Sequence, residues 1–188
     1  LEGFAVNAGE QLVVVNATND NPVYIEGLTA NTTYWFFVQT VCGAETSEWA
    51  GPFEFKTECG VFTELPLFEG FESGIPDCWS IYNFDGQVQE WVISTAQANT
   101  GNNSMFHNYN FDVNQDGWLV TPAIEIPATG ENLLSFWSYN TFPTYYAKNS
   151  VLISTGSGDP LSPDFVEVWS PASVASTWTE TELPLLAY

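Results

Sequence analysis

Short runs of strand-forming residues, separated by turn-forming residues, recur along the whole chain. Runs rich in Val, Ile, Thr, Tyr, Phe and Trp last about five to eight residues before Gly, Pro, Asn or Asp interrupts them. No window of about eleven residues has apolar side chains at the helical spacing i, i+3, i+4, i+7, so we expect essentially no long helix. Many short strands joined by turns predict an all-β chain of sandwich or jelly-roll type. The expected strands include Gln11–Asn16, Val23–Leu28, Tyr34–Cys42, Phe53–Thr57, Trp118–Pro122, Leu133–Tyr139 and Ser150–Thr155.

The charge of the chain is strongly negative and limits its partners. The 23 acidic residues are opposed by two basic residues, Lys56 and Lys148, which gives a formal net charge of −21. Binding nucleic-acid phosphates requires Lys and Arg side chains, and an anionic membrane surface would repel this chain, so neither partner is expected. No apolar run approaches the ~18 residues of a spanning helix, so we expect no direct membrane insertion. Hydrophobic residues still make up 45% of the sequence, which is enough for a folded core.

The first part of the chain, residues 1–58, has a tyrosine that enters a predicted strand just after a turn. Such a tyrosine can hydrogen-bond back to the backbone upstream, as in the tyrosine corner of Ig-like sandwiches. Leu28, Thr32 and Tyr34 resemble the L-x-P-x-T-x-Y signature of fibronectin type III domains, with Ala30 in place of the proline. The segment Ser47–Thr57 is similar to the last hairpin of that family. A whole sandwich of this kind needs about 100 residues, so we expect only its C-terminal part here.

The second part, residues 59–188, carries several motifs in a fixed order. They are E-x-F-E at 69–72, P-x-C-W at 76–79 and W-L-V-T-P at 118–122. Over residues 65–182 the chain resembles the cleaved adhesin family, a MAM-like jelly roll in the haemagglutinin regions of gingipains and in other large secreted proteins of the Bacteroidota. The resemblance implies a jelly roll whose last two or three strands would follow Tyr188.

The resemblance covers an adhesin portion and not a peptidase domain. It implies a non-catalytic adhesion or ligand-binding segment of a large secreted or cell-surface bacterial protein. Its expected partners are an extracellular protein or glycan and the neighbouring domains of the same long chain, since the sequence starts at Leu1 and is expected to be part of a longer protein. Two alternatives remain open: an accessory carbohydrate-binding segment of a secreted polysaccharide-degrading enzyme, and a structural stalk with no ligand.

The residues themselves give little support for catalysis. The single histidine, His107, lies in a segment whose alternation fits a strand, and we interpret it as structural. No G-x-S-x-G, H-E-x-x-H or C-x-x-C motif occurs, so no catalytic residue is predicted. The sequence predicts no bound cofactor other than calcium.

Two acidic segments are candidate calcium ligands, because calcium takes carboxylate, amide and carbonyl oxygens on loops. Asp112, Asn114 and Asp116 precede Gly117 as in the first half of an EF-hand loop, but Ala123 replaces its final Glu, so a complete EF-hand is excluded. The family resemblance further implies structural calcium near the opening strand of the jelly roll. The candidate ligands there are Glu69, Glu72 and Asp85; the alternative is that these acids are simply solvated.

Aromatic residues gather in a turn-rich segment that follows a predicted strand. Tyr139, Phe142, Tyr145 and Tyr146 lie there, where binding loops are commonly found, and are our candidate ligand-binding residues. Most of the tryptophans are expected to fill the core instead, and Trp79 and Trp118 match anchors of the resembled family.

Three cysteines allow at most one disulfide within the chain. In an antiparallel hairpin Cys42 and Cys59 would lie at opposite ends, roughly 25 Å apart at about 3.3 Å per residue. A disulfide needs Cα atoms within about 7 Å. Cys59 and Cys78 bracket the expected opening strand of the jelly roll, and the chain can turn back at Gly74–Pro76. We therefore predict a Cys59–Cys78 disulfide, with Cys42 free or paired outside this chain.

Overall fold

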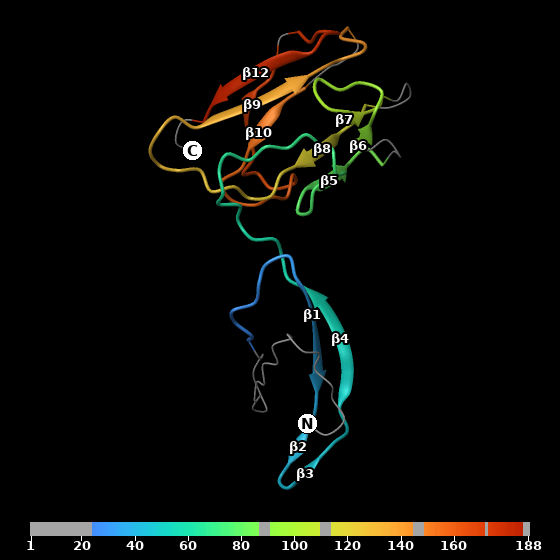
Figure 1. Ribbon diagram of the computed structural model, residues 1–188, viewed down its shortest axis with the longest axis vertical. Helices are drawn as coiled ribbons and strands as arrows, with labels where there is room; N and C mark the ends of the chain where they lie inside the picture. Colours follow the sequence, from blue (N-terminus) through green and yellow to red (C-terminus); the bar gives the residue numbers. More distant parts are fainter. Residues whose placement is uncertain (1–23, 87–90, 110–113, 145–148, 172, 186–188) are drawn as a thin grey trace. The chain divides into compact units, whose positions relative to one another are not determined.

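The computed structural model describes residues 24–86, 91–109, 114–144, 149–171 and 173–185, and within them it is all-β (Figure 1). These residues form twelve strands and no helix. No described segment is therefore a helix long and apolar enough to cross a membrane. The chain divides into two compact units, Leu1–Glu58 and Cys59–Tyr188.

The first unit is built around one long antiparallel pair, β1 (Thr33–Val38) and β4 (Ala50–Lys56). Two short strands, β2 (Val41–Cys42) and β3 (Glu45–Thr46), form a second hairpin between them. Because side chains alternate along a strand, the register places four aromatic rings on one face. Their centroids lie 5.2–6.1 Å apart, a spacing that favours aromatic contacts; the rings are Tyr34, Phe36, Phe53 and Phe55.

The hydrogen bond predicted for Tyr34 is present. Its hydroxyl oxygen accepts a bond from the backbone N–H of Thr29, five residues upstream, at 2.8 Å. The loop is tied to the end of β4 as well, because the Thr57 hydroxyl donates to the carbonyl of Thr29 at 2.7 Å and accepts from the N–H of Thr32 at 2.9 Å. The assignment of this unit to fibronectin type III domains stays a prediction.

One predicted strand of the first unit is wrong and another cannot be placed. In the segment Val23–Leu28, the described residues from Tyr24 onward form no strand. Gly27 has φ of +74°, a left-handed conformation that an extended strand does not contain, and it bends the chain ahead of β1. The segment Gln11–Asn16 lies outside the described residues.

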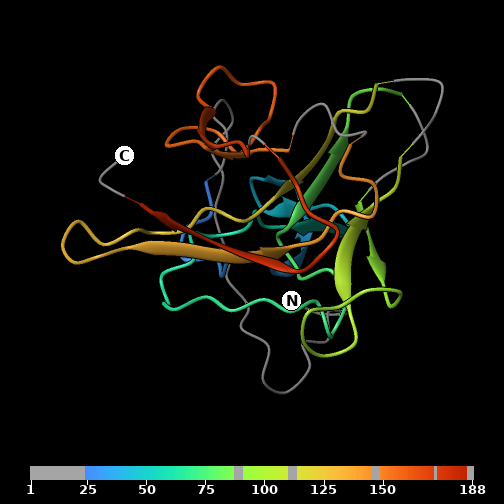
Figure 2. The same cartoon turned by 90° about the horizontal axis from the view of Figure 1, so that it is seen from above.

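The second unit consists of two sets of nested antiparallel pairs. In the first set, β5 (Ser80–Asn83) pairs with β8 (Gly117–Val120), and between them in sequence β6 (Trp91–Ser94) pairs with β7 (Ser104–His107). In the second set, β9 (Leu133–Ser138) pairs with β12 (Thr179–Pro184), and between them β10 (Val151–Ile153) pairs with β11 (Val166–Trp169). Figure 2 shows β9 and β12 lying side by side as the longest pair of this unit. In each set, the strands of the inner pair lie between those of the outer pair in the sequence. This nested connectivity is expected of a jelly roll.

Edge-to-face aromatic contacts join these pairs. The Trp118 ring lies 5.4 Å from that of Phe165, and the Phe136 ring lies 5.2 Å from that of Trp169. Near the start of the unit the Trp79 ring packs at 5.4 Å against Phe71. These rings are half-buried, and no side chain among the described residues is completely buried. The interior of this unit is therefore a set of aromatic contacts between two-stranded sheets.

Candidate functional site

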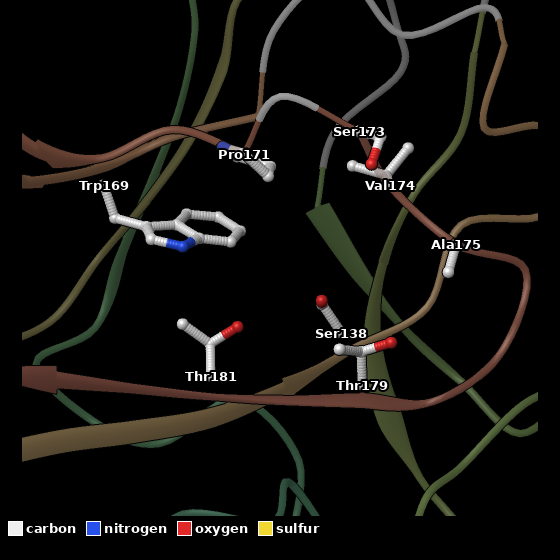
Figure 3. Close-up of a pocket in the computed structure, with 8 residues that line it drawn as sticks. All are labelled: Ser138, Trp169, Pro171, Ser173, Val174, Ala175, Thr179 and Thr181. Carbon is white, nitrogen blue, oxygen red and sulfur yellow. The ribbon is translucent and has the colours of Figure 1, made fainter.

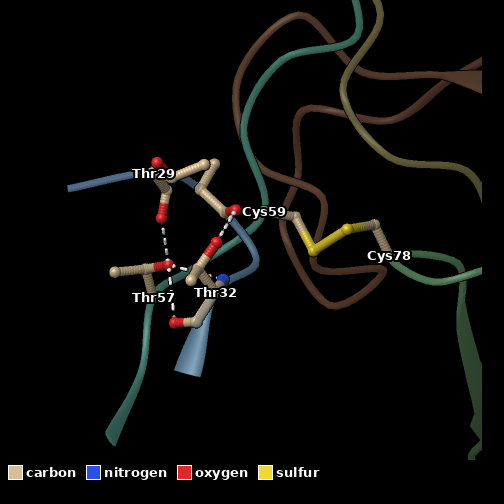
Figure 4. The surroundings of a disulfide bond; sticks show 6 residues. Thr29, Thr32, Thr57, Cys59 and Cys78 are labelled. Carbon is tan, nitrogen blue, oxygen red and sulfur yellow. Dashed lines mark hydrogen bonds between the residues drawn. A yellow bond between two sulfur atoms is a disulfide. The ribbon is translucent and has the colours of Figure 1, made fainter. Parts of the chain in front are cut away.

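A disulfide closes the segment that opens the second unit. Cys59 and Cys78 are bonded, with their Cα atoms 5.8 Å apart, and this is the pairing that the sequence predicts (Figure 4). Cys42, in the short β2–β3 hairpin of the first unit, is exposed and free. Cys59 and Cys78 are the only cysteines in the sequence of the second unit, and both are disulfide-bonded. Neither has a free thiol that could act as a nucleophile.

Glu72 anchors a distant loop through its carboxylate. Its Oε1 accepts hydrogen bonds from the backbone N–H of Asn102 at 3.0 Å and of Asn103 at 2.9 Å. The loop can approach this closely because Gly101 has φ of +65° and no side chain, and a Cβ at that position would collide with the carboxylate. The hydrogen bonds from Asn103 and Asn102 hold the pKa of Glu72 below its ordinary value of 4.5.

The two glutamates predicted as calcium ligands thus make different contacts in the structure. Glu72 Oε2 also receives bonds from Asn102, from its backbone N–H at 3.1 Å and its side-chain amide at 3.4 Å. Glu69 accepts a short bond from the backbone N–H of Phe71. Both carboxylates accept hydrogen bonds from backbone N–H groups.

Replacing Glu72 by glutamine is expected to lower the melting temperature at neutral pH. The amide oxygen that remains is a weaker acceptor than a carboxylate for the N–H groups of Asn102 and Asn103. Because the folded-state pKa of Glu72 lies below 4.5, its stabilisation is complete above that pH and is lost as the pH falls through the folded-state pKa. The melting temperatures of the wild type and of Glu72→Gln should therefore become equal as the pH is lowered.

Glu182→Gln is the matched control, since it makes the same charge change at an exposed position on β12. It is expected to leave the melting curve close to that of the wild type. Equal effects of the two substitutions at every pH would show that Glu72 contributes only its charge.

Asp85 and Asp116 are brought together by the pairing of β5 with β8. The register sets Asn83 opposite Gly117, so the turn after β5 lies beside the residue that precedes β8. The backbone N–H of Asp116 donates to Asp85 Oδ2 at 3.2 Å, and the N–H of Phe84 donates to the Asp116 carbonyl at 3.0 Å. Asp116 Oδ1 accepts from the indole N–H of Trp118 at 2.8 Å. The carboxylates of Asp85 and Asp116 and the Asp116 carbonyl oxygen therefore lie on two loops that hydrogen bonds connect.

The other members of this predicted calcium loop are Asn114 and Asp112. Asn114 is described and lies two residues before Asp116, and Asp112 lies outside the described residues. Within the part of the chain that the structure describes, no three His, Cys, Asp or Glu side chains gather closely enough to hold a metal ion. Any calcium site here would use amide, carbonyl or water oxygens beside the two aspartates.

His107 is a packed strand residue. It ends β7, and its ring contacts Trp91 edge-on at 5.4 Å and lies against Gly117. Burial lowers the pKa of His107, while the negative charge of Asp85 and a hydrogen bond with the Asn108 backbone act in the opposite direction. Among the described residues its Nε2 has no hydrogen-bond partner. The described contacts of the ring are packing contacts with Trp91 and Gly117.

The predicted aromatic segment is only partly described, and its two described rings, Tyr139 and Phe142, pack against different partners. Tyr139 packs against Trp178 with ring centroids 5.6 Å apart, whereas Phe142 packs edge-on against Tyr109 at 5.8 Å. Phe142 is 47% exposed and borders a small cavity of about 170 Å³ that His107 also lines. Tyr145 and Tyr146 lie outside the described residues. Tyr109 is a contributor that sequence reasoning missed, because it lies far upstream in the chain.

A larger groove lies beside the β9–β12 pair (Figure 3). Its volume is about 340 Å³, and the Trp169 ring extends into it from β11. Ser138, Thr179 and Thr181 face it from the sheet, and Ser173 faces it from the loop that follows β11. That loop is held in place because the Asn140 N–H donates to the Ala175 carbonyl at 3.0 Å. The groove combines one large aromatic ring with four hydroxyl groups.

The model of one protein family, the Cleaved Adhesin Domain, matches residues 64–181. Among similar proteins, Hemagglutinin A of Porphyromonas gingivalis is 28% identical over 106 residues, covering 51% of this chain and 4% of that protein. Lys-gingipain W83 of the same species is 25% identical over 179 residues, covering 86% of this chain and 10% of that protein.

The chain therefore spans at most a tenth of the length of these two relatives. No solved structure matches it. The family model covers most of the second unit, including β5 to β11 and the E-x-F-E, P-x-C-W and W-L-V-T-P motifs. The chain belongs to the cleaved adhesin domain family.

Proposed function

We propose that this chain is a ligand-binding adhesion module of a longer extracellular protein, with an extracellular protein or glycan as its ligand. The observation that carries the proposal is the family match over residues 64–181. The chain is a non-catalytic adhesin segment, and its relatives are named as a hemagglutinin and as gingipains. Because it corresponds to a small part of each, the neighbouring domains of a long chain are its first partners.

An extracellular location, secreted or on the cell surface, agrees with the chemistry of the second unit. A disulfide such as Cys59–Cys78 persists in oxidising environments and is rare in reducing ones. The net charge of −21 keeps such a chain in solution and away from anionic membranes. Both features suit a protein that acts outside the cell.

Exposed aromatic side chains support a binding role for the surface. Trp137 is 46% exposed on β9, and Phe142 is 47% exposed four residues after that strand ends. Exposed aromatic rings are enriched where proteins bind ligands, because they bury a large apolar area with few rotatable bonds. The predicted ligand-binding residues Tyr139, Phe142, Tyr145 and Tyr146 remain a proposal at this edge.

Structural calcium is also part of the proposal, placed at Asp85 and Asp116. Both carboxylates lie on loops whose backbones contact each other, and calcium accepts mixed carboxylate, carbonyl and water ligands. A cation there would reduce the repulsion among the acidic groups of a chain of net charge −21. Glu69 and Glu72 of the opening segment, which accept backbone hydrogen bonds, stay proposed ligands as well.

The purified chain is expected to show no hydrolase activity. Cys59 and Cys78 are joined in a disulfide and cannot attack a substrate, and the His107 ring is packed against Trp91. Release of product from peptide and polysaccharide substrates is the measurement. Turnover that a single substitution at an acidic residue or His107 abolishes would contradict the non-catalytic assignment.

Cell adhesion to the immobilised chain tests the binding function. Erythrocytes are the first probe, because one relative is named as a hemagglutinin, and a panel of extracellular matrix proteins is the second. Retention above that of a surface coated with an unrelated β-sandwich of similar charge supports the proposal. Retention of neither probe would favour a structural stalk, whereas binding of isolated polysaccharides alone would favour an accessory carbohydrate-binding segment.

A further inference from the structure

We propose that the groove beside the β9–β12 pair binds a neutral sugar ring, with Trp169 as the stacking platform. The inference rests on the proposed adhesion function and names the ligand class of one site. It goes beyond the aromatic segment at 139–146, because it concerns a different part of the second unit. The groove is defined by Trp169, Ser138, Ser173, Thr179 and Thr181, with Pro171 at its loop side.

The position of the Trp169 ring is fixed by its neighbours. Trp169 ends β11, and its ring lies 5.2 Å from Phe136 at an interplanar angle of 85°. Phe136 belongs to β9 and is set opposite Thr181 of β12, so the ring contacts the inner face of the β9–β12 pair. A ring held by such a contact loses little freedom when a ligand packs against it, which lowers the entropic cost of binding.

The hydroxyl groups around the ring are available to a ligand. The Thr179 hydroxyl donates to the Thr177 carbonyl at 3.2 Å and keeps its acceptor capacity. The hydroxyls of Ser138, Ser173 and Thr181 have no hydrogen-bond partner among the residues that the structure describes. Each can both donate and accept a hydrogen bond, as a sugar hydroxyl can.

The absence of charge in the groove selects the ligand class. The lining residues in the described part of the chain are Trp, Pro, Ser, Thr, Val and Ala, and none of them ionises. The net charge of −21 repels anionic ligands, and no carboxylate in the lining attracts a cation. A volume of about 340 Å³ is at the lower end of the roughly 300–1,000 Å³ typical of small-molecule sites. An uncharged ring with an apolar face and several hydroxyls fits these conditions, and a hexopyranose is such a ring.

Titration with simple glycosides, followed by NMR, tests the proposal. The probes are the methyl glycosides of glucose, galactose, mannose and N-acetylglucosamine, with methyl glucuronide as the anionic comparison. The indole N–H signal of Trp169 is assigned from its loss in Trp169→Phe. At least one neutral glycoside is expected to shift this signal in the millimolar range, and the glucuronide is expected to bind at least tenfold more weakly.

Paired variants separate a sugar site from a general effect on folding. Ser138→Ala and Thr181→Val remove one groove hydroxyl each and are expected to weaken binding about three- to tenfold. Ser135→Ala is the matched control, because Ser135 lies on β9 like Ser138 but on the opposite face of the strand. The affinity of this variant for the glycoside should equal that of the wild type. Trp169→Ala should abolish binding; if it fails to fold, the hydroxyl variants still decide the question.

Three results would overturn the inference. They are no shift of the Trp169 signal with any neutral glycoside, equal affinities for Ser138→Ala and Ser135→Ala, and a groove that accepts free indole but no glycoside. Cell adhesion by the immobilised chain distinguishes this failure from failure of the proposed function. Adhesion that persists in Thr181→Val and Trp169→Phe, with no glycoside binding, would leave the adhesion function standing with its ligand elsewhere.

Discussion

Replacing Cys59 and Cys78 together by alanine is expected to lower the unfolding free energy of the second unit by about 3 kcal/mol. The bridge joins residues 19 positions apart, and closing a loop of this length removes roughly that much conformational entropy, expressed as free energy, from the unfolded chain. This loss is a large share of the total stability, because no side chain in the described part of the chain is completely buried and the hydrophobic contribution per residue is small. Denaturant unfolding monitored by tryptophan fluorescence measures the change.

Cys42→Ala is the control for the disulfide prediction. Cys42 is exposed and free in the first unit, so its replacement should leave the denaturation midpoint unchanged. Peptide mapping without reduction should recover a linked peptide that contains Cys59 and Cys78. Recovery of a Cys42–Cys59 peptide, or an unchanged midpoint for the double variant, would show that the pairing is wrong.

Calcium is expected to raise the melting temperature of the second unit by about 10 °C when it is present at about 100 times its dissociation constant. Saturation of one site at that ratio contributes about 2.7 kcal/mol, and a domain of this size gains a few degrees per kcal/mol. Melting in EDTA and in millimolar calcium is the comparison. Asp85→Asn should remove most of the difference, because it takes one charge from the Asp85–Asp116 cluster.

Glu182→Gln, which changes the net charge equally, should retain the full effect of calcium. Loss of the calcium effect in Glu72→Gln and not in Asp85→Asn would instead move the site to the opening segment. Identical melting curves in EDTA and in calcium would show that the second unit has no stabilising calcium site.

The all-β class could be predicted because strand period and turn residues are local properties. The alternation Tyr34–Phe36–Val38 and the run Leu133–Ser138 both form strands close to the predicted bounds. The hydrogen bond of Tyr34 could be predicted as well, because its donor, the Thr29 N–H, lies only five residues upstream. Val23–Leu28 failed because the apolar run suggested a strand, while Gly27 adopts a left-handed conformation.

The contacts within the candidate sites could not be predicted, because long-range pairing creates them. Glu72 meets Asn102 and Asn103 across 30 and 31 residues, and Asp85 meets Asp116 only because β5 pairs with β8. The groove combines Ser138 of β9, Trp169 of β11 and Thr181 of β12. The pairing of these strands could not be predicted from the sequence. Cys59–Cys78 was accessible to sequence reasoning because only three pairings exist and one was geometrically excluded.

Agglutination of erythrocytes by beads that display many copies of the chain tests the proposed function most directly. Multivalent display converts a weak single contact into measurable adhesion, so even a millimolar ligand site is detected. We predict that the beads agglutinate cells in the presence of calcium and that excess soluble chain suppresses agglutination. Beads that agglutinate no cells, or that do so to the same extent as beads carrying an unrelated β-sandwich of matched charge, would contradict an adhesion function.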